Sequence, residues 1–370
     1  MSKGIYNKVQ EHLKGYSPQG CCIENLNSIF ISFQYESETE TGICIAYYTT
    51  KRENVWSAEC WGQYYRSQCN FTTIPEKNFI LVGWHGDVIA QHGFKENGVP
   101  KFVEEKGIPI LRNCPIMRIR NIEGKAYIAA NWRTIFRRDG INNWTLLHGN
   151  NPSQIETWRK ANRDLGFNDI GGFSEKDIYA CGGQGDLWHL TDKAFEELDC
   201  PTNLELKSLC CAPDGKVYIG CEDGSLIVGR DSSWEILNTK APNTDILDMI
   251  WYKDKLYLAC GMYGLYIYDE DNIKPAEGIS GLASTISDDT TLSGKTKDIL
   301  ADNGVDKDII GLAEAITPAE GILTPASIHS LSTNGDILLV AGTDKVVAFN
   351  GTDWKVLYAP FGLDMGGELW

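Results

Sequence analysis

Residues 217–229 read VYIGCEDGSLIVG, two apolar runs separated by a polar turn that contains glycine. Apolar runs bounded by Glu-Asp-Gly are typical of a β-hairpin, because the glycine supplies the positive φ that a tight turn needs. Tyr218 marks the first run, and Leu226 follows it eight residues later in the second run. The same pattern recurs along the chain, which indicates an internal repeat.

The repeat has a period of 39 residues in its clearest part, because Tyr179 and Tyr257 lie 39 residues before and after Tyr218. Each of these tyrosines is followed eight residues later by a leucine and sixteen residues later by a bulky apolar residue, namely Leu187, Leu226 and Leu265, then Phe195, Trp234 and Ile273. Further copies start at Tyr127 and Leu338, and a looser one starts at Leu81. We expect these side chains to fill the space between repeats.

A period near 40 that consists of short strands is typical of a β-propeller blade of four antiparallel strands. In one repeat the strands are predicted at 206–212, 216–221, 225–230 and 234–237. The six copies, over roughly residues 79–358, resemble blades of the propeller superfamily that includes WD-repeat proteins, although the WD dipeptide is absent. The resemblance implies a propeller that serves as a binding platform.

The predicted fold is all-β, a six- or seven-bladed propeller of four-stranded antiparallel blades with a partly helical insertion. A seventh blade is expected from residues 28–62, either alone or shared with the C-terminal FGLDMGGELW. Residues 1–27 are predicted to be an N-terminal extension, residues 28–370 the propeller, and residues 274–325 roughly the insertion. Within the insertion, Val305, Ile309, Leu312 and Ile316 have helical spacing.

Composition limits the function. The formal net charge of -16 disfavours nucleic acid as a ligand and suits a basic protein partner. The chain shows no secretory h-region and no run of 18 apolar residues. Its 12 cysteines include Cys44 and several others inside apolar runs, so we expect free thiols in a reducing compartment. We therefore expect a cytoplasmic monomer that needs no cofactor, metal or membrane.

The predicted blade has long connections at one end only. The connection from the last strand of one blade to the first strand of the next includes 91–114, 149–167 and the insertion 274–325. Long loops of this kind tend to be functional. Aromatic residues and arginine at exposed turns are typical of interface hot spots, so this end is the expected partner-binding face. Its predicted binding residues are Trp84, His85, Trp132, Arg133, Trp158, Gln184, Glu222, Asp223 and Tyr263. The alternative is that these residues pack on neighbouring loops.

Catalytic motifs are missing from the sequence, since no HExxH, GxSxG or P-loop stands in a suitable context. The predicted innermost strands carry Arg118, Arg120, Asp169, Asp248 and His329. The leading hypothesis is a non-enzymatic, protein-binding propeller, within which we favour a bacterial immunity protein that neutralises a toxin. The alternative hypothesis is a hydrolase or lyase that works at the axial channel through His329 and Asp248. A structural or phage-type component is a third interpretation.

Overall fold

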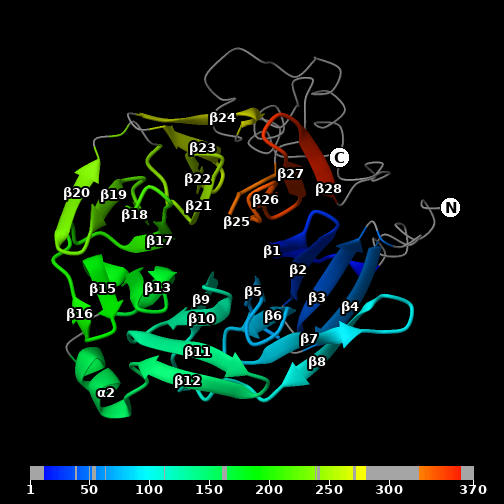
Figure 1. Ribbon diagram of the computed structural model, residues 1–370, viewed down its shortest axis with the longest axis horizontal. Coiled ribbons are helices and arrows are strands. Elements are labelled where there is room, and N and C mark those ends of the chain that lie inside the picture. The colour runs from blue at the N-terminus through cyan, green and yellow to red at the C-terminus, as the bar shows by residue number, and fades with distance from the viewer. Residues whose placement is uncertain are drawn as a thin grey trace, which may run out of the picture.

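The computed structural model is a ring of seven blades, with the first strand β1 and the last strand β28 in neighbouring blades (Figure 1). It describes residues 12–37, 40–49, 51, 56–62, 64–111, 113–160, 165–237, 239, 242–269, 272–280 and 325–359. Each blade is a sheet of four antiparallel strands in sequential order. We letter these strands A to D, from the axis of the ring outward.

The first four blades occupy the N-terminal part of the chain. Blade 1 comprises β1 (Ser17–Asn25), β2 (Ser28–Glu36), β3 (Thr41–Thr49) and β4 (Trp56–Gly62). Blade 2 comprises β5 (Ser67–Thr72), β6 (Asn78–Gly83), β7 (Val88–Phe94) and β8 (Pro100–Glu105). Blade 3 comprises β9 (Ile116–Ile122), β10 (Lys125–Ala130), β11 (Thr134–Gly140) and β12 (Asn143–His148). Blade 4 comprises β13 (Phe167–Ser174), β14 (Asp177–Gly182), β15 (Asp186–Thr191) and β16 (Phe195–Glu197), with the 3-10 turn η1 (Gly183–Gly185) between β14 and β15.

The other three blades complete the ring. Blade 5 comprises β17 (Leu206–Cys211), β18 (Val217–Cys221), β19 (Leu226–Arg230) and β20 (Ser233–Leu237). Blade 6 comprises β21 (Asp248–Tyr252), β22 (Lys255–Ala259), β23 (Gly264–Asp269) and β24 (Asn272–Ser280). Blade 7 comprises β25 (Ser330–Thr333), β26 (Leu338–Ala341), β27 (Val346–Phe349) and β28 (Trp354–Tyr358). The hairpin 217–229, together with β17 and β20, therefore matches the predicted blade strand for strand.

The hydrophobic core is divided into seven clusters, one between each pair of adjacent blades. The tyrosine anchors lie in these clusters. Tyr127, Tyr179, Tyr218 and Tyr257 each pack toward the following blade, with the residue eight positions later on the same side. Trp234 and Phe195 pack toward the preceding blade. Each blade thus buries both of its faces. For this reason the sequence of its inner strands consists of short apolar runs, separated by polar turns.

Two of the predicted repeat anchors are out of register. Leu81 packs toward the preceding blade, and Leu338 also packs toward the preceding blade. In blade 7 the side chain that occupies the equivalent face is Leu339. Successive side chains of a strand point to opposite faces, so an error of one residue in the alignment exchanges the two interfaces. The strands are where they were predicted, but these two anchors were wrong.

The ring begins earlier than predicted, because β1 lies inside the segment assigned to an N-terminal extension. Blade 1 is complete in itself at residues 17–62, so the ring has seven blades without a strand from the C-terminus. The innermost strand escaped prediction because it is built of small and polar residues. At Gly20 a Cβ atom would lie 3.2 Å from the Sγ of Cys69 and 3.3 Å from the Oγ of Ser32. The FGLDMGGELW segment lies outside the described residues.

The long connections also differ in extent from the prediction. The first one, predicted at 91–114, includes the end of β7 and all of β8, so the connection itself runs from 106 to 115. Strand β8 is an outer strand whose side chains are mostly half-buried or exposed, and its polar sequence resembles a loop. The connection at 149–167 contains the helix α2 (Pro152–Lys160). The proposed insertion begins with a strand, because β24 extends to Ser280, and its helical pattern at 305–316 lies outside the described residues.

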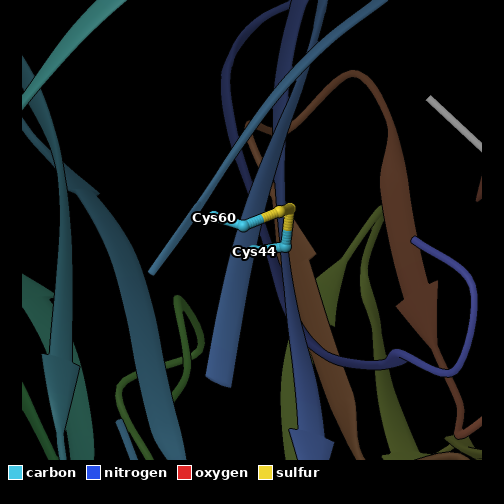
Figure 2. Close-up of a disulfide and its surroundings, with 2 residues drawn as sticks. All are labelled: Cys44 and Cys60. Carbon is cyan, nitrogen blue, oxygen red and sulfur yellow. A yellow bond between two sulfur atoms is a disulfide. The ribbon is translucent and has the colours of Figure 1, made fainter. Parts of the chain in front are cut away.

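Blade 1 carries a disulfide that the sequence did not suggest. Cys44 of β3 and Cys60 of β4 stand directly opposite each other, with their Cα atoms 4.0 Å apart, and their sulfurs are bonded (Figure 2). Cys44 is fully buried, whereas Cys60 is exposed on the outer strand. The interpretation of Cys44 as a free thiol was therefore wrong. In the described part of the chain, no helix is both long and apolar enough to cross a membrane.

Candidate protein-binding site

The B–C turns and the D–A connections form one face of the ring, which we call the partner face. Hydrogen bonds between main-chain atoms join several of these turns to a connection beside them. The N–H of Trp84 donates to the carbonyl of Arg66 (2.9 Å), and the N–H of Trp132 donates to the carbonyl of Leu165 (3.0 Å). The N–H of Glu222 likewise donates to the carbonyl of Glu205 (3.1 Å). The predicted binding residues are therefore held on a continuous, ordered surface.

Arg133 lies in the B–C turn of blade 3 on this face, but it is buried rather than exposed. Its guanidinium donates to both carboxylate oxygens of Asp186, at 2.8 and 2.7 Å, and to Glu197 at 2.9 Å. The guanidinium carbon also lies 4.7 Å from the ring centroid of Trp188 and 5.5 Å from that of Trp158. Arg133 thus joins blade 3 to blade 4, so the expected exposed hot spot was wrong at this position.

Beneath Arg133 an aromatic group includes His148, the last residue of β12. Its ring lies 4.4 Å from Phe195 and 5.2 Å from Trp188, measured between centroids. Burial, together with the positive charge of Arg133, lowers the pKa of His148 to about 4. The imidazole is therefore neutral near pH 7 and packs as an aromatic ring.

Helix α2 projects from the partner face between blades 3 and 4. Asn151 caps its first turn, because its side-chain oxygen accepts the N–H groups of Ser153 (3.1 Å) and Gln154 (3.3 Å). Ile155 is the residue of the helix that is buried, and Trp158 is half-buried. The helix is amphipathic: Ile155 and Trp158 form its apolar side, and its polar side faces solvent.

A groove of about 330 Å³ separates helix α2 from the 106–115 connection. It is lined by Leu111, Asn113, Pro152, Ile155, Glu156 and Arg159. Trp132 stands beside it, with its indole N–H donated to the carbonyl of Asn113 at 2.9 Å and with Arg159 5.8 Å from its ring. Apolar walls with charged residues at the rim suit a protruding side chain of a partner.

A second aromatic group surrounds Trp84 at the turn of blade 2. The guanidinium carbon of Arg66 lies 4.6 Å from the Trp84 ring centroid, and the Tyr65 ring lies 5.5 Å from it. Trp84 and Tyr65 are half-buried, while Arg66 and His85 are exposed. Arg66 and Tyr65 escaped prediction because they precede β5, in a short connection that had no repeat anchor to place it.

Carboxylates gather on the partner face around blade 5. Lys207 pairs with Glu205 at 2.6 Å and with Asp245 at 3.3 Å, while Glu222 and Asp223 are exposed at the neighbouring turn. One lysine among four carboxylates leaves this region negative. It is the part of the face that best suits a basic partner.

The turn of blade 6 adds an apolar side chain beside these carboxylates. Met262 is 63% exposed, whereas Tyr263 packs against the cluster between blades 5 and 6. Met262 is thus the residue that this turn presents to solvent, although Tyr263 was the predicted contact. Gln184 is exposed on η1, with a positive φ of 56°. The binding role of every residue on this face remains a prediction.

The predicted axial residues do meet, with His329 apart from the others. Arg120 donates to Asp169 at 2.9 and 2.6 Å and to Asp248 at 2.6 Å, and Arg118 lies 3.6 and 3.9 Å from the same two carboxylates. Burial acts to raise the pKa of Asp248, but the charges of Arg120 and Arg118 outweigh it, so that pKa is lowered. This ion-pair network joins blades 3, 4 and 6 across the axis.

The axial carboxylates also accept hydrogen bonds from main-chain N–H groups. Asp169 accepts the N–H of Leu209 of blade 5 at 2.9 Å, and Asp248 accepts the N–H of Leu331 of blade 7 at 2.8 Å. His329 instead lies beside two carbonyls, 2.9 Å from that of Ser327 and 3.2 Å from that of Gln19. Every carboxylate oxygen of the cluster thus has a partner, which suits a structural role better than a general base.

Over the described residues, no group of three or more His, Cys, Asp or Glu side chains has the arrangement to hold a metal ion. Cys210 is buried in β17 and Cys114 is buried in the 106–115 connection, and burial raises the pKa of Cys210 to about 12 and that of Cys114 to about 11. Thiols with raised pKa values are poor nucleophiles and poor ligands near neutral pH. These cysteines serve as small apolar residues of the core.

No protein-family model matches the chain. A curated protein, the Immune protein Tsi7 of Pseudomonas aeruginosa strain PAO1, is 34% identical to it over 139 residues. The match covers 37% of this chain and 44% of that protein, so it spans less than half the length of the relative.

Solved structures of other propellers are similar in fold. Sqt1 of Saccharomyces cerevisiae is 12% identical, with a TM-score of 0.54 over 95% of this chain and 87% of that one. The WD40 propeller domain of Doa1 is 10% identical, with a TM-score of 0.56 over 91% and 94% of the two chains. YCF48 bound to D1 peptide is 13% identical, with a TM-score of 0.55 over 92% and 93%. These similarities show that the chain adopts the β-propeller fold.

Proposed function

We propose that this propeller is an immunity protein, which binds a toxic protein through the partner face and neutralises it. The observation that carries the proposal is the partial similarity to the Immune protein Tsi7. The half-buried aromatic residues and the exposed arginines and carboxylates of the partner face supply a surface that is suited to protein binding. The axial cluster, with its carboxylate oxygens all occupied, gives no support to the alternative of a hydrolase or lyase.

The partner is proposed to be basic where it contacts blades 5 and 6. The chain has a formal net charge of -16, and four carboxylates gather around Lys207 on the partner face. Opposite charges on the two surfaces would speed their association, and added salt would slow it. We further propose that the protein acts in the cytoplasm as a monomer, and that the exposed Trp84 and α2 regions contribute apolar contacts.

Affinity isolation of the tagged, full-length protein from its native host tests this proposal. Mass spectrometry is expected to identify one stoichiometric protein partner. Expression of that partner alone should arrest growth, and co-expression of this protein should restore growth. Recovery of no stoichiometric partner, or recovery of a partner that is harmless on its own, would overturn the proposal.

A further inference from the structure

A cavity of about 350 Å³ lies on the face opposite to the partner face, where the A strands of several blades end. Its walls come from blades 1, 2, 3 and 7, so it lies at the mouth of the axis. The residues that line it are Cys22, Ile23, Glu24, Asn25, Asn70, Phe71, Thr73, Lys77, Asn121, Ser332, Thr333 and Asn334. Its volume suits a small molecule or a single side chain.

Glu24, near the end of β1, is the notable member of this wall. Its Oε2 atom is buried and lacks a hydrogen-bond partner among the described residues. A buried carboxylate oxygen without a donor destabilises the folded protein, since it has given up water without replacement. Burial correspondingly raises the pKa of Glu24, while the charges of Lys51 and Lys77 act in the opposite direction.

Hydrogen bonds hold several polar side chains of the wall in place. Two of them join blades 2 and 3: the amide of Asn121 donates to the carbonyl of Phe71 at 2.8 Å, and that of Asn70 donates to the carbonyl of Ile119 at 3.3 Å. Within blade 7, Thr333 donates to the carbonyl of Ile337 at 2.7 Å. Because these side chains are already fixed, a ligand would find a preformed cavity and lose little binding energy to its ordering.

We propose that this axial cavity binds a small ligand through a primary ammonium group, which donates to the unpartnered carboxylate oxygen of Glu24. An ammonium group carries three donors and a positive charge, so it supplies a hydrogen bond to the Oε2 atom of Glu24 and a charge opposite to that of the carboxylate. Lys77 is exposed and lines the same cavity, and its charge also acts on Glu24. The asparagines suit an amide or hydroxyl beside the ammonium group. The site is separate from the partner face and from the axial ion pairs.

Three related probes test the ammonium requirement with the full-length protein. L-alaninamide carries the ammonium group, L-alanine carries it with a carboxylate, and N-acetyl-L-alanine lacks it. Saturation-transfer NMR and calorimetric titration are expected to detect the first two probes and not the third. Absence of binding by both ammonium probes, or equal binding of N-acetyl-L-alanine, overturns the proposal.

Variants assign the effect to Glu24. Glu24→Gln keeps the shape of the side chain and removes the charge, so it is expected to weaken alaninamide binding at least about tenfold. The variant should melt no lower than the parent, because it removes an unpaired buried charge. Glu76→Gln, an exposed residue of the neighbouring β5–β6 turn, is the matched control and should bind as the parent does. Unchanged binding in Glu24→Gln overturns the proposal.

Discussion

Arg120 is the residue on which the axis of the ring depends. One guanidinium pairs with Asp169 of blade 4 and Asp248 of blade 6, and because these two acids are buried, water cannot replace Arg120 as their partner. Arg120→Met should therefore lower the free energy of unfolding by about 3–5 kcal/mol, as expected when one partner of a buried ion pair is removed. Chemical denaturation measures the change. Arg66→Met, which removes an exposed arginine, should cost far less. Equal losses in the two variants would contradict the structural role of Arg120.

His148 gives the stability of the protein a defined dependence on pH. Its pKa is about 4 in the folded protein and 6.5 is the ordinary value, so the unfolded chain binds the extra proton first as pH falls. The contribution of His148 is therefore fully present above pH 6.5 and is lost as pH falls toward 4. For a partly exposed group the loss is about 1–2 kcal/mol.

His148→Phe should remove this dependence while it keeps the aromatic packing against Trp188 and Phe195. Chemical denaturation at several pH values between 7 and 4 measures the slope of stability against pH. The slope should be smaller in the variant than in the parent, whereas His85→Gln, at an exposed turn, should leave it unchanged. An unaltered slope in His148→Phe would show that the imidazole does not titrate as described.

A residue could be predicted from the sequence where the strand pattern alone determines the direction in which its side chain points. Tyr218 and its equivalents follow the alternation of a strand, and they were placed correctly. The axial acids and arginines were also placed correctly, since innermost strands converge. Arg133 was not, because its positive φ of 54° and its pairing with Asp186 depend on the neighbouring blade. Glu24 carried no motif that could have revealed its cavity.

At the scale of the element, the β3–β4 hairpin is cross-linked by Cys44 and Cys60. Cys60→Ser should lower the free energy of unfolding by about 1–3 kcal/mol, because the closed loop no longer restricts the unfolded chain. Cys60 is exposed, so the substitution leaves the packing around Cys44 intact. Denaturation of both proteins with and without a reductant is the measurement. The difference should vanish in reductant, and a difference that persists would assign the loss to packing instead.

Strands that form continuous apolar runs could be predicted from the sequence, and strands without such runs could not. Strands β6, β10, β18 and β22 have buried residues throughout most of their length, and the repeat identified each of them. Strand β1 lies at the crowded axis and uses small residues, whereas β8 lies at the rim and uses polar ones. Neither position imposes the pattern by which strands are recognised. The position of a strand within its blade therefore determined whether the strand could be recognised from the sequence.

For the whole molecule, the proposed partner face gives a directional prediction. Met262→Lys should weaken partner binding about 30-fold or more if this exposed side chain is a hot spot, since an apolar contact is lost and a positive charge is placed against the basic surface of the partner. Leu26→Lys is the matched control, because Leu26 is 46% exposed on the opposite face. Surface plasmon resonance with the isolated partner measures both. A similar loss in the two variants, or no loss in either, would place the interface elsewhere.

The junction between blades 7 and 1 is expected to resist a mechanical pulling force differently from the other six junctions. Every other pair of neighbouring blades is linked by the chain itself, whereas the described residues of blades 7 and 1 meet through non-covalent contacts, such as that between Phe33 and Tyr358, whose rings lie 4.8 Å apart. Among the described residues, no strand crosses this junction. A force that pulls the two ends of the chain apart would therefore separate these two blades first, and the remaining blades would unravel in sequence from the two free edges.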